Sequence, residues 1–142
     1  MDSTDYKILN ILQQNGRISM SKLAKEVSLS IPSTIERVKK MEESGIILGY
    51  SAKINPSKLG RNYNAIVLSS ATLENRDKCT KLVTEDSRVV QAYRLTGRFT
   101  GCMKISCENE ESFLDLLNKF YTFGIYETYM IVDTIKDNSI IK

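Results

Sequence analysis

The 142-residue sequence contains no histidine. Histidine is the side chain most often used as a general base, it completes many serine and cysteine catalytic triads, and it is a common zinc ligand. Its absence excludes those triads and every histidine-containing zinc site, although carboxylate and lysine chemistry stay open. We therefore predict that the chain is not an enzyme and has no catalytic residues.

Cysteine is scarce as well. The three cysteines, Cys79, Cys102 and Cys107, are odd in number and form no C-x-x-C pair. This set predicts reduced thiols rather than a disulfide framework or a zinc site. Cys102 and Cys107 are five residues apart on an expected strand, so their side chains should point to opposite faces. We expect no metal and no cofactor.

Long apolar runs are also missing. No stretch approaches the roughly 20 apolar residues of a membrane span. The polar start, Met1 to Asp5, lacks the basic and apolar segments of a signal peptide. We expect a cytoplasmic protein with no membrane partner.

Positive charge is concentrated in the first part of the chain. Residues 1–61 contain ten Lys or Arg and six Asp or Glu, a net charge of +4, whereas residues 62–142 contain ten and eleven, a net charge of −1. A basic module beside a nearly neutral one indicates a polyanionic partner for the basic module.

Residues 1–45 predict three short helices. We expect Ser3 or Thr4 to cap the first helix, which extends to about Asn15, and Ser19 or Ser21 to cap the second, at about residues 20–27. Ser30 is placed to cap a third helix that ends before Gly45. Its expected inward residues, at helical spacing, are Ile35, Val38 and Met41.

The segment from Leu23 to Ser30, followed by Ile35 and Val38, is typical of a helix-turn-helix module, in which the third helix lies in the major groove of DNA. We expect Ser33, Thr34 and Arg37 to reach base edges, and Arg17, Lys39 and Lys40 to contact phosphates. Glu36 would accept from a cytosine amino group or orient a basic neighbour. The full candidate set is Arg17, Ser19, Ser21, Ser30, Pro32, Ser33, Thr34, Glu36, Arg37, Lys39 and Lys40. The alternative is a three-helix packing unit with a solvated polar face.

The remaining sequence changes period. Residues 46–54 are expected to be extended, and the turn-rich stretch from Asn55 to Gly60 predicts a linker. Strands are then expected at 63–73, 88–96, 102–107 and 125–135, and helices at 74–86 and 109–123. The order β-α-β-β-α-β is that of ferredoxin-like domains. We predict an α+β chain with a helix-turn-helix domain at 1–45, a linker strand and turn at 46–61, and an oligomerisation or effector domain at 62–142.

Two apolar patterns specify faces in this second half. We expect one core stripe on the helix at 109–123, made of Phe113, Leu116, Leu117, Phe120 and Tyr121. In the strand at 88–96, simple alternation places Val89, Gln91, Tyr93 and Leu95 on one face. Tyr126 and Tyr129 are expected at a sheet face or subunit interface rather than in a ligand site.

Nearly the whole chain resembles the leucine-responsive/asparagine regulator (Lrp/AsnC) family. The matching segments are Asp5-x-x-Ile8-Leu9-x-x-Leu12, Asn15-Gly16-Arg17-Ile18-Ser19, Leu23-Ala24-x-x-Val27-x-Leu29-Ser30, Arg37 to Ala52, Lys58-Leu59-Gly60 and Tyr93-x-Leu95-Thr96-Gly97. The resemblance implies a winged-type helix-turn-helix domain with the third helix as recognition helix, and an ACT-like second domain. It also implies that the strand at 46–54 helps to form a dimer, that sheets pair face to face, that dimers often form octamers, and that an amino acid binds between dimers.

The effector loop departs from the family pattern. Many members have Gly-Asp-x-Asp where this chain has Gly97-Arg98-Phe99-Thr100-Gly101. The carboxylate that would receive an amino acid's ammonium group is missing, and Arg98 would repel that group and attract a carboxylate. Two alternatives stay open, an atypical effector or no effector.

The leading hypothesis is a DNA-binding transcriptional regulator that acts as a dimer or larger oligomer and responds to an amino acid or another small ligand. The alternative is an architectural, nucleoid-type protein with little sequence preference and no effector. Sirohaem decarboxylases, which resemble this family in fold, use histidine, so this chain argues against that activity. The target operators, the sign of regulation and the oligomer size do not follow from the sequence.

Overall fold

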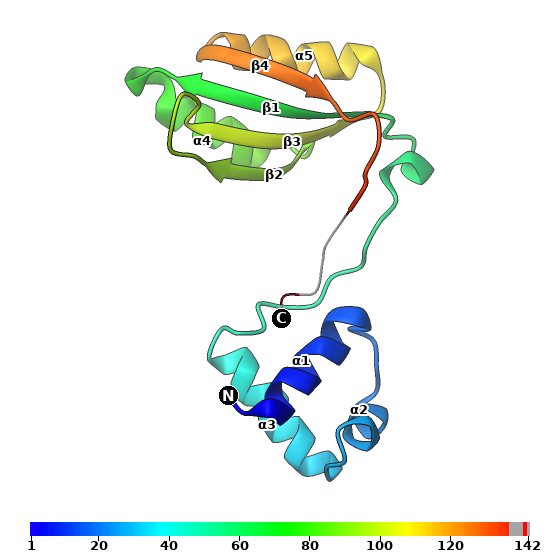
Figure 1. Ribbon diagram of the computed structural model, residues 1–142. Helices are drawn as coiled ribbons and strands as arrows, with labels where there is room; N and C mark the ends of the chain where they lie inside the picture. Colours follow the sequence, from blue (N-terminus) through cyan, green and yellow to red (C-terminus); the bar gives the residue numbers. More distant parts are fainter. Residues whose placement is uncertain (137–140, 142) are drawn as a thin grey trace. The chain divides into compact units, whose positions relative to one another are not determined.

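The computed structural model describes residues 1–136 and Ile141. The chain divides into two compact units (Figure 1). The N-terminal unit contains Met1–Lys53 together with Lys136 and Ile141, and the C-terminal unit is Ile54–Ile135. No helix in the described part of the chain is long and apolar enough to cross a bilayer.

The N-terminal unit consists of three helices, α1 (Ser3–Gln14), α2 (Met20–Glu26) and α3 (Ile31–Glu43). Each helix contributes apolar residues at helical spacing to one shared core, as the sequence predicts. The buried members of that core are Ile8, Leu12, Leu23, Val27, Val38 and Met41.

The helix starts follow the predicted chemistry with one correction. Ser19 caps α2 and Ser30 caps α3, each accepting from a backbone N–H of the first turn. The cap of α1 is Asp2, and not Ser3 or Thr4. The Asp2 carboxylate accepts from the N–H of Asp5, and the Asp5 carboxylate accepts from the N–H of Asp2, so the two form a capping box.

The buried side of α3 differs from the prediction at one of its three positions. Thr34, Val38 and Met41 are buried, whereas Ile35 is 46% exposed. The Thr34 hydroxyl donates to the Ser30 carbonyl at 3.0 Å, which satisfies its polar group inside the unit. Two predictions are therefore wrong, since Thr34 points inward and Ile35 points outward.

The segment after α3 is not a strand. Gly45 adopts a left-handed conformation, and the N–H groups of Ile46 and Ile47 both donate to the Met41 carbonyl. Residues 48–55 then have no regular secondary structure before the short 3-10 helix η1 (Pro56–Leu59). A strand needs a neighbouring strand to share its backbone hydrogen bonds, and the strand pairs found among the described residues do not include this segment.

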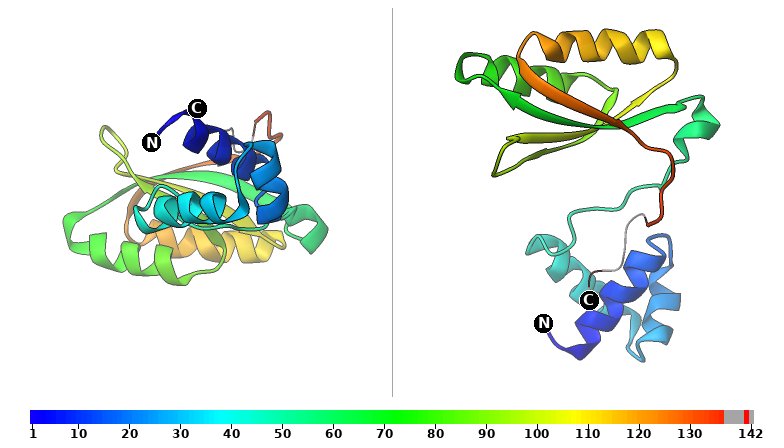
Figure 2. Two further views of the ribbon diagram at one scale, coloured as in Figure 1. Left: turned by 90° about the horizontal axis from the view of Figure 1, so that it is seen from below. Right: turned by 45° about the horizontal axis from the view of Figure 1, so that its top comes forward.

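The C-terminal unit has a four-stranded antiparallel sheet in the order β2-β3-β1-β4. The strands are β1 (Tyr63–Ala71), β2 (Val89–Arg94), β3 (Gly101–Cys107) and β4 (Gly124–Met130). Two helices, α4 (Arg76–Glu85), preceded by η2 (Leu73–Asn75), and α5 (Glu110–Tyr121), lie on the same face of the sheet (Figure 2). The predicted α+β class and the β-α-β-β-α-β order are confirmed. The last strand ends at Met130 instead of Ile135.

The core of this unit lies between the sheet and its helices. The strands contribute Ala65, Val67, Met103, Ile105 and Cys107, and α5 contributes Phe113, Leu116, Leu117 and Phe120. Tyr121 was expected in the same stripe but is 55% exposed, with its ring edge-on to Tyr126 at 6.2 Å. Cys102 and Cys107 lie on opposite faces of β3, as predicted.

An irregularity in β2 changes which side chains share a face. Val89 pairs with Ile105, but the register shifts before Gln91, which pairs with Lys104. Val89 thus faces the helices, while Gln91 and Tyr93 face the opposite side. The prediction that Val89, Gln91 and Tyr93 share a face is therefore wrong. Simple alternation assumes a regular strand, and the register shift adds one residue to β2.

Candidate nucleic-acid interface

The outward side of α3 is polar and accessible. Ser30, the cap of α3, is exposed, as are Pro32, Ser33, Glu36, Lys39 and Lys40. The Lys39 ammonium lies 3.6 Å from the Glu43 carboxylate on the next turn, and both side chains are solvated. A single α-helix fits the major groove of duplex DNA, and this side offers hydroxyl, carboxylate and ammonium groups to base edges and phosphates.

Hydroxyl groups gather at the starts of α2 and α3. The Ser19 and Ser21 hydroxyl oxygens are 3.2 Å apart, and the Ser30 hydroxyl donates to that of Ser33 at 2.9 Å. Arg17 is exposed in the turn between α1 and α2. Exposed helix N-termini with hydroxyl and backbone donors suit anionic oxygens.

Thr34 does not belong to this surface. Its side chain is fully buried, and its hydroxyl is bonded to the backbone of its own helix. The predicted contact between Thr34 and a base edge is therefore wrong.

Arg37 is occupied within the protein. Its Nη1 atom lies 2.8 Å from the Asp2 carboxylate and 2.7 Å from the Asp5 carboxylate. Hydrogen bonds to these two carboxylates raise the pKa of Arg37. A base contact by this nitrogen would require it to leave both acids. This pairing was not predicted from the sequence, although the D-x-x-D capping box at the start of α1 marks a point of concentrated negative charge.

Two apolar side chains on α3 were also missed. Ile31 is 45% exposed and Ile35 is 46% exposed, one helical turn apart. Apolar side chains in the major groove contact the methyl group of thymine. The signal in the sequence is that Ile31 and Ile35 lie outside the 34, 38, 41 spacing of the buried stripe.

The loop from Gly97 to Gly101 connects β2 to β3. Arg98 lies 3.3 Å from the carboxylate of Glu127 on β4, and its guanidinium lies 5.2 Å from the centre of the Phe99 ring. Glu127 also accepts from the Tyr129 hydroxyl. The loop therefore has a carboxylate at its side after all, supplied by a residue that sequence reasoning did not select.

The backbone of this loop is tied to the sheet at Thr100. The Thr100 N–H donates to the Ser69 carbonyl at 2.8 Å, and the Leu95 N–H donates to the Thr100 carbonyl at 2.9 Å. Gly97 adopts a positive φ of 119° that disfavours a side chain.

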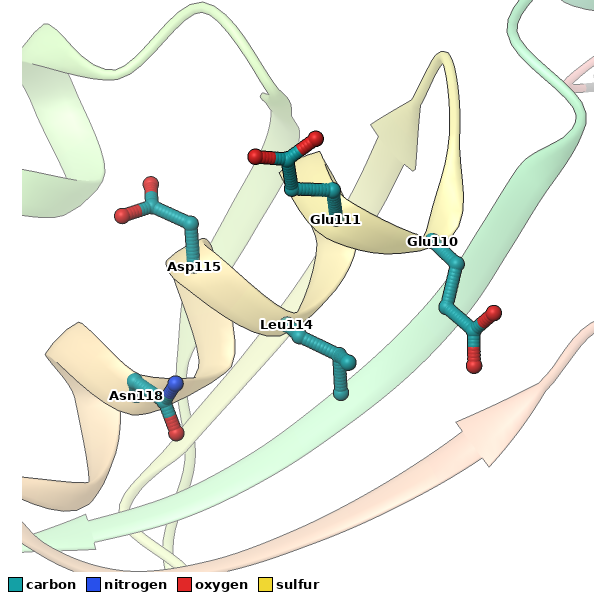
Figure 3. A pocket seen from close by; sticks show the side chains of 5 residues that line it. All are labelled: Glu110, Glu111, Leu114, Asp115 and Asn118. Carbon is teal, nitrogen blue, oxygen red and sulfur yellow. The ribbon is translucent and has the colours of Figure 1, made fainter.

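The surface of the C-terminal unit is hollowed in places. A cleft of about 230 Å³ lies between α4 and the sheet. A broader, open depression of about 510 Å³ follows α5, where the carboxylates of Glu110, Glu111 and Asp115 are arranged around Leu114 (Figure 3). This acidic depression would repel DNA. In the described residues no group of three or more cysteine or carboxylate side chains is arranged to hold a metal ion.

Comparisons with known proteins agree with this geometry. A family model for a winged helix-turn-helix DNA-binding domain matches residues 1–47. YezC of Bacillus subtilis, named an uncharacterised HTH-type transcriptional regulator, is 34% identical over 134 residues, covering 94% of this chain and 95% of that protein. LrpC of the same organism, an HTH-type transcriptional regulator, is 31% identical over 137 residues, covering 95% and 94%.

Solved structures extend the likeness to the whole fold. The structure of Bacillus subtilis LrpC has a TM-score of 0.91 at 28% identity, covering 97% of this chain and 99% of that one. A transcriptional regulator from Neisseria meningitidis, solved as a complex with L-Met, has a TM-score of 0.91 at 25% identity, covering 100% and 96%. With both domains matched along almost their full lengths, the chain belongs to the Lrp/AsnC family of helix-turn-helix, DNA-binding transcriptional regulators.

Proposed function

We propose that the chain controls transcription as a dimer that places two α3 helices in successive major grooves of an operator. The observation that carries this proposal is the exposed, hydroxyl-bearing and basic side of α3 around Ser33, Glu36 and Lys40. Ser33 and Glu36 would read base edges, and Lys39, Lys40 and Arg17 would contact phosphates. Arg37 would position α3 against α1 instead of reading bases.

The second part of the proposal concerns assembly. The sheet face away from α4 and α5 carries exposed or half-exposed apolar side chains from β1, β2 and β4: Ile66, Leu68, Tyr93, Ile125 and Tyr129. Contiguous exposed apolar surface of this kind favours a protein partner. We propose that a second copy of the chain covers this open face. We also propose that residues 46–61 form a linker, and that residues 46–54 of this linker pair with the second copy in the dimer.

The third part is an effector response. The Neisseria meningitidis regulator was solved with L-Met. We propose that the loop Gly97–Gly101, with Arg98 and Phe99 at its tip, belongs to the site through which a small ligand alters DNA binding.

DNA binding is tested by selecting bound duplexes from a random pool and then measuring affinity for selected and scrambled DNA at several salt concentrations. We expect affinity that falls steeply with salt and a selected sequence that binds at least roughly 1,000-fold tighter than scrambled DNA. Equal affinity for both duplexes would replace this proposal with the architectural one.

Assembly is tested by analytical ultracentrifugation of Ile125→Glu. Because a charge would be buried at the proposed dimer face, we expect this variant to sediment as a smaller species than the unmodified protein. Leu114→Glu is the matched control, since Leu114 is a comparably exposed apolar residue on α5. An unchanged assembly for Ile125→Glu would show that the open face is not the interface.

A further inference from the structure

The cleft between α4 and the sheet has one apolar side and one positively charged side. Its apolar lining includes Ala71, Ala92 and Met103 from the strands and Val83 from α4. Arg76 and Arg94 lie at its edge. None of the residues that line it in the described structure is acidic.

Arg94 is bonded to α4 one helical turn from Arg76. The Arg94 Nη2 atom, from the end of β2, donates to the Thr80 hydroxyl at 3.3 Å. Arg76 precedes Thr80 by one helical turn, and its carbonyl accepts from the same hydroxyl at 2.8 Å. The hydrogen bond to Thr80 thus fixes the Arg94 guanidinium to α4, and Arg76 and Arg94 both line the cleft.

Two other arginines of this unit form ion pairs with carboxylates, and a third is bonded to the backbone. Arg88 pairs with Asp86 and Asp115, and Arg98 pairs with Glu127. Arg61 donates to two backbone carbonyls. Neither Arg76 nor Arg94 has a carboxylate within ion-pair distance among the described residues, so the positive charge at the cleft is uncompensated there.

Ser69 adds a hydroxyl group to the same cleft. Ser69 is 5% exposed and is one of the lining residues. Ser69 pairs with Gly101, and a Cβ at Gly101 would come within 2.4 Å of the Ser69 oxygen. Glycine at this position therefore leaves room for the Ser69 hydroxyl beside the cleft.

We propose that this cleft binds a small organic carboxylate that lacks a neighbouring ammonium group, such as a short-chain 2-oxo acid. The guanidinium groups of Arg76 and Arg94 and the Ser69 hydroxyl would donate to the carboxylate. The short apolar body would lie on Ala92 and Met103. An amino acid of the same skeleton is disfavoured, because its ammonium group would lie beside two cations with no carboxylate in the lining to receive it.

This inference deepens the proposed effector response and rests on it, since Thr100 and Gly101 line the cleft and also belong to the loop Gly97–Gly101. It gives that site a ligand class, a carboxylate without an amine. The volume of about 230 Å³ suits a ligand of a few carbon atoms and excludes nucleotides.

The test is calorimetric titration of the full chain with three probes: 4-methyl-2-oxopentanoate, L-leucine, which has the same carbon skeleton, and inorganic phosphate. We expect saturable binding of the oxo acid at least tenfold tighter than binding of either other probe. Equal or tighter binding of leucine, phosphate binding as tight as that of the oxo acid, or no binding of the oxo acid would each overturn the inference.

Variants then locate the site. Arg76→Gln and Arg94→Gln should each weaken oxo-acid binding at least tenfold, whereas Lys78→Gln, an exposed neighbour on α4 outside the cleft lining, should leave it unchanged. Circular dichroism of each variant checks folding, and the comparison among probes on the unmodified chain does not depend on any variant. Oxo-acid binding that survives both arginine changes would place the ligand elsewhere.

DNA affinity of the ligand-free chain separates the two proposals. Retained operator binding with no oxo-acid binding would defeat the inference alone. Lost operator binding with intact oxo-acid binding would defeat the proposed function alone.

Discussion

Arg37, near the middle of α3, lies 2.7 Å from the carboxylate of Asp5 in the first turn of α1. The same guanidinium nitrogen lies 2.8 Å from Asp2, the cap of α1. The side chains that define the start of α1 thus also hold the helix that we propose to enter DNA. The orientation of α3 depends on two acids that lie far from it in sequence.

The clearest test of this relationship is Asp5→Asn. Removing a negative charge from a DNA-binding domain should strengthen binding if charge alone mattered. We expect a several-fold weaker operator affinity instead, because α3 loses its fixed position. Glu26→Gln is the control, since it removes an exposed acid on α2, and it should leave affinity equal or higher. Stronger binding by Asp5→Asn, measured by fluorescence anisotropy, would show that Arg37 is not a positioning residue.

The same contacts predict acid sensitivity. The hydrogen bond from the Asp2 N–H and those from Arg37 hold the pKa of Asp5 below 3.8, and the Asp5 N–H and Arg37 do the same for the pKa of Asp2. A depressed carboxylate pKa stabilises the fold above the unfolded value, and the contribution is lost as the pH falls through the folded value. The difference in melting temperature between the unmodified chain and Asp5→Asn should be present at pH 6 and shrink below about pH 4. A difference that stays constant down to pH 2.5 would contradict this account.

Lysine contacts with phosphate should appear in the salt dependence. Lys39→Ala and Lys40→Ala should each lower the slope of log affinity against log salt by about 1 and weaken specific and random DNA alike. Lys81→Ala, an equally exposed charge change on α4, is the control and should leave the slope unchanged.

Glu36→Ala should instead change which operator is preferred, by about 1–3 kcal/mol. An unaltered preference would remove Glu36 from the base-reading set.

Two neighbouring apolar residues on α3 should behave differently. Val38 is 4% exposed in the core, so Val38→Ala should cost about 2 kcal/mol of unfolding free energy. Ile35 is 46% exposed, so Ile35→Ala should cost less than about 1 kcal/mol while weakening binding to operators that place thymine opposite it. Urea denaturation measures the first quantity and operator variants measure the second. If Ile35→Ala and Val38→Ala lowered the unfolding free energy by similar amounts, the assignment of Ile35 to the surface would be wrong.

Two arginines of the C-terminal unit should contribute differently to its stability, because they differ in burial. Arg88, with a 17% exposed side chain, lies 2.6 Å from Asp86 and 2.8 Å from Asp115, and it also donates to the Ser112 carbonyl. Arg88→Ala should therefore destabilise this unit by about 2 kcal/mol. Arg98 is 81% exposed beside Glu127, so Arg98→Ala should cost less than about 0.5 kcal/mol. Similar losses for both, measured by thermal unfolding, would contradict the importance of burial here.

Local rules were sufficient for much of the fold. Ser19 and Ser30 begin helices because a hydroxyl satisfies first-turn N–H groups, and the α5 stripe from Phe113 to Phe120 forms the core at helical spacing. Most of the polar side of α3 followed from the same periodicity. Elements that depend only on neighbouring residues, such as helix caps and helical periodicity, can therefore be predicted from the sequence.

Predictions failed where the position of a residue depends on a partner distant in the sequence, or where a polar side chain is buried. Thr34 was placed outside because it is polar, but a hydroxyl that bonds to the carbonyl four residues earlier can be buried. The shift between Val89 and Gln91 depends on the neighbouring strand β3. The pairing of Arg37 with Asp2 and Asp5 was missed because the two acids belong to the start of another helix. The cleft at Arg76 and Arg94 joins two elements, so no sequence window contains it.

Adjacent residues of β2 point to opposite sides of the sheet. Arg94 crosses to Thr80 on α4, while Tyr93 pairs with Cys102 on the face without helices and is 58% exposed. Since one peptide bond joins them, any movement of this edge strand toward α4 withdraws the Tyr93 ring from whatever it touches. A molecule that draws Arg94 toward α4 would thus also move Tyr93, and so change the contact between the open face and a second subunit that we propose to cover it.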